Sequence, residues 1–142
     1  MPQKIRVVAL CIFRRNDEIL VGECRDAVTG ESFYRPLGGK VEFGERGSDA
    51  AEREIREEIG AETENLRYLG LKEALFTYEG TRRHEIALIF QGEFCDKSLY
   101  QEDCYPRKDK KQTDRRAVWK PIAFFGNSRV KLYPADLLDL IH

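Results

Sequence analysis

Hydrophobic and polar residues follow two different periods along this chain. Short runs rich in β-branched and aromatic residues lie at both ends and in the middle, which is typical of strands. Between them Ala51, Ile55 and Ile59 recur four residues apart, which predicts an amphipathic helix. The predicted strands are Ile5–Phe13, Glu18–Glu23, Phe33–Leu37, Leu66–Leu71, Ala74–Tyr78, His84–Glu93 and Ala117–Trp119.

Turn and capping residues divide these runs. The polar group Arg14–Asp17 separates the first two strands and predicts a hairpin between them. Glu79-Gly80 predicts the turn before the last long strand. Ser48 is suited to the N-cap of the helix and Gly60 to the position after its end, so we expect a helix of about three turns.

The second half of the chain adds two further features. Phe94–Arg116 is a long polar segment, and connections of this length in small domains are commonly functional. Pro134 suits the first turn of a helix, and the leucines and isoleucine that follow it predict a C-terminal amphipathic helix over Pro134–Ile141.

Composition narrows the class of protein. The 142 residues predict a single domain spanning 1–142, and the hydrophobic fraction of 42% is enough for a core. No apolar run approaches the roughly 20 residues of a membrane span, and no secretory signal is recognised, so we expect a cytoplasmic protein. The net charge of −1 argues against bulk binding to nucleic acid or membranes. The four cysteines, which lack metal-ligand spacing, are interpreted as free thiols.

Three carboxylates lie within five residues of the predicted central helix. Glu54 and Glu58 project from one face with Cβ atoms roughly 5–6 Å apart, and Glu57 lies on the adjoining flank. Such like charges call for a compensating cation, and oxygen ligands favour Mg²⁺ or Mn²⁺. A solvated charged face is the simpler alternative. The glycine-rich loop before the helix and the apolar stripe on its opposite face favour a ligand site.

The stretch from Gly39 to Ala61 resembles the Nudix box, G-x5-E-x7-R-E-U-x-E-E-x-G-U, where U is a bulky aliphatic residue. All seven fixed letters match, and only the last U departs, because Ala61 stands there. The resemblance implies a Nudix-type α/β/α sandwich with a mixed β-sheet. We expect the box helix and the Pro134–Ile141 helix to flank that sheet.

The resemblance also implies a metal-dependent hydrolase that cleaves a nucleoside diphosphate linked to another moiety. Glu54, Glu57 and Glu58 match the positions that bind metal or activate water, and the Gly39 carbonyl matches a backbone ligand. Arg53 and Glu45 match a pair that holds the loop against the helix. The identity of the catalytic base stays open. A Nudix-like module that binds nucleotides without hydrolysing them is the alternative, although all three box carboxylates are present.

Other residues are weaker candidates. Arg35, just before the box, suits bidentate contact with a phosphate, and a salt bridge is the alternative. Tyr78 lies 17 residues after Ala61, where a tyrosine marks dinucleoside polyphosphate hydrolases of the family; a core or base-stacking residue is the alternative. Glu85 and Asp114 are each considered for a supporting metal role. We expect a small nucleotide substrate, such as a (d)NTP or a dinucleoside polyphosphate, and the sequence leaves a homodimer open.

Overall fold

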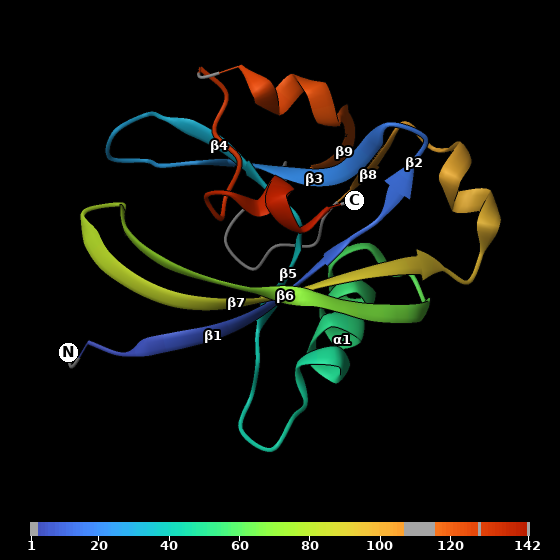
Figure 1. Cartoon of the computed structure of the whole chain (residues 1–142), viewed down its shortest axis with the longest axis horizontal. Helices are drawn as coiled ribbons and strands as arrows, with labels where there is room; N and C mark the ends of the chain where they lie inside the picture. Colours follow the sequence, from blue (N-terminus) through green and yellow to red (C-terminus); the bar gives the residue numbers. More distant parts are fainter. Residues whose placement is uncertain (1–2, 107–115, 128, 142) are drawn as a thin grey trace.

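The computed structural model describes residues 3–106, 116–127 and 129–141. Within these ranges the chain forms two β-sheets, one α-helix and three short 3₁₀ helices, and the two sheets lie one above the other in Figure 1. In chain order the elements are β1 (Ile5–Ile12), β2 (Arg14–Arg15), β3 (Glu18–Arg25), β4 (Ser32–Arg35), β5 (Leu37–Lys40), α1 (Gly47–Ile59), β6 (Thr63–Tyr78), β7 (Thr81–Phe94), η1 (Lys97–Gln101), β8 (Cys104–Pro106), β9 (Arg116–Pro121), η2 (Ile122–Gly126) and η3 (Leu137–Leu140).

The two sheets differ in strand direction. The first, called sheet A, has the order β5-β1-β7-β6, with β1 and β7 parallel and the other neighbours antiparallel. The second, sheet B, has the order β2-β3-β9-β8, with β4 also paired to β3, and is antiparallel throughout. The mixed α/β architecture is therefore confirmed, although its strands are divided between two sheets.

The prediction that Ile5–Phe13 and Glu18–Glu23 pair as a hairpin is wrong for most of the first strand. From the first predicted strand and the polar group after it, the short strand β2 pairs with β3, whereas β1 pairs with β5 and β7 in the other sheet. The chain changes sheets at Phe13, which is fully buried. Because Val8–Ile12 is buried on both faces, β1 belongs in the interior of a sheet, which the β5–β1–β7 pairing provides.

Two other strand predictions change in extent. The runs Leu66–Leu71 and Ala74–Tyr78 form the single strand β6, whose register against β7 shifts twice, before Arg67 and before Gly70. Phe33–Leu37 is instead divided at Pro36 into β4 and β5, which belong to different sheets. Proline has no N–H for a sheet hydrogen bond, so it suits the break. The turn at Glu79-Gly80 is confirmed.

Helix α1 matches the prediction closely. It begins two residues earlier than expected, with Arg46 rather than Ser48 at the N-cap, and Gly60 ends it in the left-handed conformation at φ 70°. Ala51 and Ile55 are fully buried and pack with β1 and β7, in a cluster that also holds the buried thiol of Cys11. The charged face of α1 is thereby turned away from this core.

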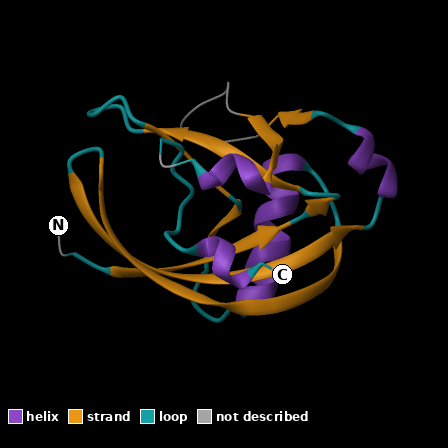
Figure 2. Ribbon diagram, turned by 45° about the horizontal axis from the view of Figure 1, so that its top comes forward, coloured by secondary structure: helices purple, strands orange, loops and turns teal. Residues whose placement is uncertain are grey.

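The predicted C-terminal α-helix is wrong. The segment contains only the four-residue 3₁₀ helix η3, and Asp136 before it has a left-handed φ of 63°, which interrupts any helix starting at Pro134. Leu137 is nevertheless buried, in a second core cluster with Val8 and Phe125. Figure 2 shows these short helical turns beside the strands. The layer opposite α1 is thus made of 3₁₀ turns and loop.

Two expectations from composition can be compared with the described residues. None of their helices has the length and apolar character needed to cross a bilayer. All four cysteines carry free thiols, as expected.

Candidate active site

The three box carboxylates differ in exposure. The side chain of Glu54 is 17% exposed and that of Glu57 is 58% exposed, whereas Glu58 is buried. Glu54 and Glu57 meet at one point, because Nη1 of Arg53 donates to Oε1 of Glu54 at 3.0 Å and to Oε2 of Glu57 at 3.3 Å. Glu58 instead accepts a hydrogen bond from the N–H of Gly38 at 3.3 Å. The cation that two of these carboxylates contact is Arg53.

The predicted pair of Arg53 and Glu45 is present and partly buried. Nε and Nη2 of Arg53 donate to the two carboxylate oxygens of Glu45 at 2.7 and 3.0 Å, and Nη2 also donates to the carbonyl of Lys40 at 2.9 Å. These hydrogen bonds lower the pKa of Glu45 to about 2. The carboxylates around Arg53 raise the pKa of its guanidinium. One side chain thus joins the loop before α1 to the helix.

Gly39 lies directly against the Glu54 carboxylate. A Cβ on Gly39 would stand 2.5 Å from Cδ of Glu54, closer than any side chain permits. Burial raises the pKa of Glu54, and Arg53 opposes that rise. A larger residue at position 39 would therefore displace the Glu54 carboxylate from its place beside the loop.

The donor set fits a hard divalent cation. Carboxylate and carbonyl oxygens are the ligands that Mg²⁺ and Mn²⁺ prefer. Glu54 and Glu57 already converge on one positively charged nitrogen, and the Gly39 backbone is packed against Glu54. In the described parts of the chain, no three acidic, histidine or cysteine side chains are already arranged as a metal site. These oxygen ligands suit such an ion, and Arg53 holds Glu54 and Glu57 by hydrogen bonds.

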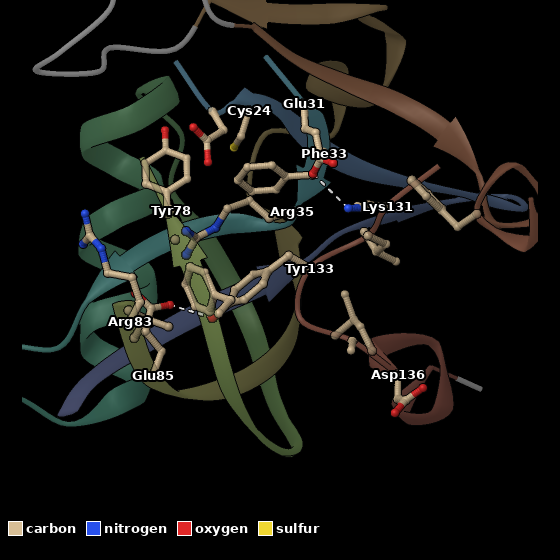
Figure 3. A pocket seen from close by; sticks show the side chains of 18 of the residues that line it. Cys24, Glu31, Phe33, Arg35, Tyr78, Arg83, Glu85, Lys131, Tyr133 and Asp136 are labelled. Carbon is tan, nitrogen blue, oxygen red and sulfur yellow. Dashed lines mark hydrogen bonds and ion pairs between the residues drawn. The ribbon is translucent and has the colours of Figure 1, made fainter. Parts of the chain in front are cut away.

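A cleft of about 880 Å³ opens between the two sheets (Figure 3). Strands β3 and β4 form one wall, strands β1, β6 and β7 another, and the segment from Val130 to Asp139 a third. Gly38 and Gly39 also line it, so the cleft borders the box, whereas the three box glutamates are not among its lining residues. Its volume is in the range of small-molecule sites.

Both predicted substrate-binding residues line this cleft. The guanidinium of Arg35 lies 5.2 Å from the ring centroid of Tyr133 and forms no salt bridge with a described carboxylate. Tyr78 donates from its hydroxyl to the carbonyl of Arg25 at 3.2 Å, and its ring packs edge-on against Phe33. The structure thus brings Arg35 and Tyr78 into one site, while their binding roles stay predictions.

Glu85, a candidate for a supporting metal role, is buried on β7. It is 3% exposed and lines the cleft, where it accepts a hydrogen bond from the Tyr133 hydroxyl at 2.6 Å and lies 3.9 Å from Arg6. Burial, reinforced by the Glu85 carboxylate, raises the pKa of Tyr133. A metal role for Glu85 stays a prediction, and Asp114 lies outside the described residues.

Sequence reasoning missed Tyr133 and Arg83 as lining residues. Tyr133 was assigned to no element and lies beside the predicted C-terminal helix. Arg83 is one of two adjacent arginines, and strand alternation places only one of them on the cleft side. The predicted strand began at His84, whereas β7 begins at Thr81. A strand prediction that included residues 81–83 would have indicated that Arg83 shares a face with Glu85.

Comparison with known proteins identifies the family. The sequence model of the NUDIX domain matches residues 3–122, and the chain belongs to this family. Its members form a class of hydrolases that act on phosphorus-containing anhydrides and generally use divalent metal ions. The recognition of the box in the sequence is thereby confirmed.

Individual relatives agree with this assignment. The NAD-capped RNA hydrolase NudC of Pseudomonas aeruginosa (strain LESB58) is 34% identical over 95 residues, which are 66% of this chain and 31% of NudC. The enzyme of the same name from Pseudomonas syringae pv. syringae (strain B728a) is 41% identical over 61 residues, 43% of this chain and 21% of that protein. The chain thus spans less than a third of the length of these curated relatives.

Solved structures share the fold. The MutT NUDIX hydrolase of Burkholderia pseudomallei superposes with a TM-score of 0.60 at 23% identity, covering 84% of each chain. A NUDIX hydrolase from Nitrosomonas europaea gives a TM-score of 0.61 at 20% identity, covering 87% of this chain and 76% of that one. At these identities the likeness concerns the fold alone.

Proposed function

We propose that this chain is a metal-dependent pyrophosphohydrolase that cleaves a nucleoside diphosphate linked to another moiety. The observation that supports this most is the convergence of Glu54 and Glu57 on a single cationic nitrogen, beside the glycine that lets backbone approach them. The Arg53–Glu57 contact alone is an ordinary i,i+4 helix pair, but Glu54, which is only 17% exposed, shares the same nitrogen and lies against Gly39. The family assignment is independent of this geometry and agrees with it.

Each box residue has a role in this proposal. Glu54, Glu57, Glu58 and the Gly39 carbonyl would hold Mg²⁺ or Mn²⁺. Such an ion neutralises charge on phosphoryl oxygens and lowers the pKa of bound water. Arg53 would keep Glu54 and Glu57 together by donating a hydrogen bond to each, with two hydrogen bonds to Glu45 fixing its own position.

The cleft between the sheets is the proposed substrate site. Its volume suits one small nucleotide, such as a (d)NTP or a dinucleoside polyphosphate, and it borders the box at Gly38 and Gly39. Arg35 would contact phosphate and Tyr78 a base. The cytoplasmic location and a homodimer stay predictions from the sequence.

The test is a substrate panel. Release of nucleoside monophosphate is measured with dNTPs, ADP-ribose, dinucleoside polyphosphates and NAD-capped RNA, in Mg²⁺, Mn²⁺ or a chelator. We expect hydrolysis of at least one compound that disappears in the chelator, and loss of most of it in Glu57→Gln and Glu58→Gln. Glu62→Gln is the matched control, because Glu62 is exposed and paired with Arg56 just beyond the helix.

Two results would contradict the proposal. Nucleotide binding without hydrolysis of any compound would instead support the non-catalytic sensor. Full activity in both glutamine variants at saturating metal would show that the box carboxylates do not hold the ion.

A further inference from the structure

Four basic side chains line the cleft, and they differ in their partners. Lys131 lies 2.9 Å from Glu31, and Arg6 lies 3.9 Å from Glu85. Arg35 and Arg83 line the same cleft and form no ion pair with any carboxylate in the part of the chain that the structure describes. Two cations in one cleft are therefore left for a ligand.

Both arginines are held by aromatic rings. The Arg35 guanidinium lies over Tyr133, and that of Arg83 lies 5.7 Å from the ring centroid of Tyr78. Figure 3 shows the Arg35 guanidinium projecting between these two tyrosines. A guanidinium placed over a ring keeps its N–H donors at its own edge, where an acceptor beside the ring can receive them.

Arg83 has a hydrogen-bond donor without an acceptor among the residues that the structure describes. Its Nε is buried and makes no hydrogen bond within the described residues. A buried donor without an acceptor is unfavourable, and a charged one more so. The Asp26 carboxylate, which also lines the cleft, instead accepts from the N–H groups of Val28, Thr29 and Glu79.

The sheet register shows how far Arg83 lies from the box. Lys40 is opposite Val8, which is in turn opposite Ala87 on β7. Arg83 is four residues before Ala87 on that strand, so its Cα lies about 13 Å along the strand from the level of the box loop. An extended arginine side chain covers only about half of that distance, so the guanidinium reaches a group that lies farther from the box than a phosphate held there.

We propose that Arg35 and Arg83 form a subsite for a second phosphate group on the substrate, a phosphate ester on the ribose. The subsite is separate from the diphosphate that is cleaved. Phosphate oxygens accept hydrogen bonds from a guanidinium in pairs, which neutral base edges do less strongly. This inference rests on the proposed function, because that function places the diphosphate at the box.

The test compares ligands that differ by one ribose phosphate. Dissociation constants are measured by calorimetry in a chelator, so that no hydrolysis is needed, for AMP against adenosine 2′,5′-bisphosphate and adenosine 3′,5′-bisphosphate, and for NAD⁺ against NADP⁺. The dinucleotide pApA is added to separate a free phosphate ester from an internucleotide phosphate. The proteins are the wild type, Arg35→Gln, Arg83→Gln and the control Arg82→Gln, whose side chain does not line the cleft.

We expect at least one phosphorylated ligand to bind about tenfold to a hundredfold more tightly than its partner, the range of charged hydrogen bonds. That preference should disappear in Arg35→Gln and in Arg83→Gln, persist in Arg82→Gln, and be accompanied by unchanged unfolding midpoints.

Equal binding within every pair, or no binding by any phosphorylated ligand, overturns the subsite. Equal weakening of both members of a pair in the two variants also overturns it, because the arginines would then contact the base or the first phosphate. Tight binding of pApA alone assigns the subsite to an internucleotide phosphate and overturns the ribose ester. These binding measurements use no metal and need no turnover. They therefore test the subsite even if the hydrolase assay shows no activity, so the two failures can be distinguished.

Discussion

Replacing Arg53 by lysine keeps the positive charge and removes the forked guanidinium. Arg53 donates five hydrogen bonds, two of them to Glu45 and one each to Glu54, Glu57 and the Lys40 carbonyl. An ammonium has three donors radiating from one atom, so at least two of the five are lost. The loop and the two carboxylates are then no longer fixed to a single rigid group.

The expected magnitude follows from this loss of position. A displacement of about 1 Å at reacting groups can cost roughly 10²-fold in rate, and we expect kcat of Arg53→Lys to fall by that order. Metal affinity should change much less, because the charge is retained. Partly buried acceptors left without donors should lower the free energy of unfolding by about 1–3 kcal/mol.

The assay measures kcat over a Mg²⁺ titration, together with an unfolding curve. Arg56→Lys is the matched control, because Arg56 is on the same helix and its pair with Glu62 is exposed. Wild-type kcat in Arg53→Lys, or a loss fully restored by more Mg²⁺, would refute the bracing role and leave Arg53 as a counterion.

Three further predictions concern packing and pH. Ile55→Ala should lower the free energy of unfolding by about 2–5 kcal/mol in a denaturant titration, because Ile55 is fully buried under the helix; a loss below 1 kcal/mol would contradict this. Gly39→Ala should reduce kcat more than the unfolding midpoint, since the added Cβ meets the flexible carboxylate of Glu54; equal kcat would show that the carboxylate can move without penalty. The pKa of Glu45, lowered to about 2 from 4.5, means that its contribution to stability is present above pH 4.5 and lost as the pH falls toward 2. The difference in unfolding midpoint between wild type and Glu45→Gln should therefore shrink over that interval, and a difference independent of pH would argue against the pair.

The sequence alone determined the box and its helix. Residue identity and spacing along one helix fix which side chains share a face, and Gly60 terminates that helix as expected. The pair of Arg53 and Glu45 was implied by the resemblance to the Nudix box, and the structure contains it. These are local relations that a linear pattern can encode.

The pairing of strands could not be predicted from the sequence in the same way. The runs around β1 and β3 resemble a hairpin locally, yet the burial of β1 on both faces places it inside sheet A. The Pro134–Ile141 segment has the apolar spacing of a helix, but its leucines meet the second core from a 3₁₀ turn. Pairing between distant segments decides such cases, and periodicity does not carry that information.

The cleft was decided entirely by the tertiary structure. Arg35, Arg83 and Tyr133 belong to β4, β7 and the C-terminal segment, and they meet because sheets A and B face each other at this position. Side chains alternate along a strand, so Arg82 and Arg83 are indistinguishable until the register places one of them in the cleft. The residues of the box and their spacing are set by the sequence, whereas the cleft proposed to bind the substrate exists only once the two sheets have packed.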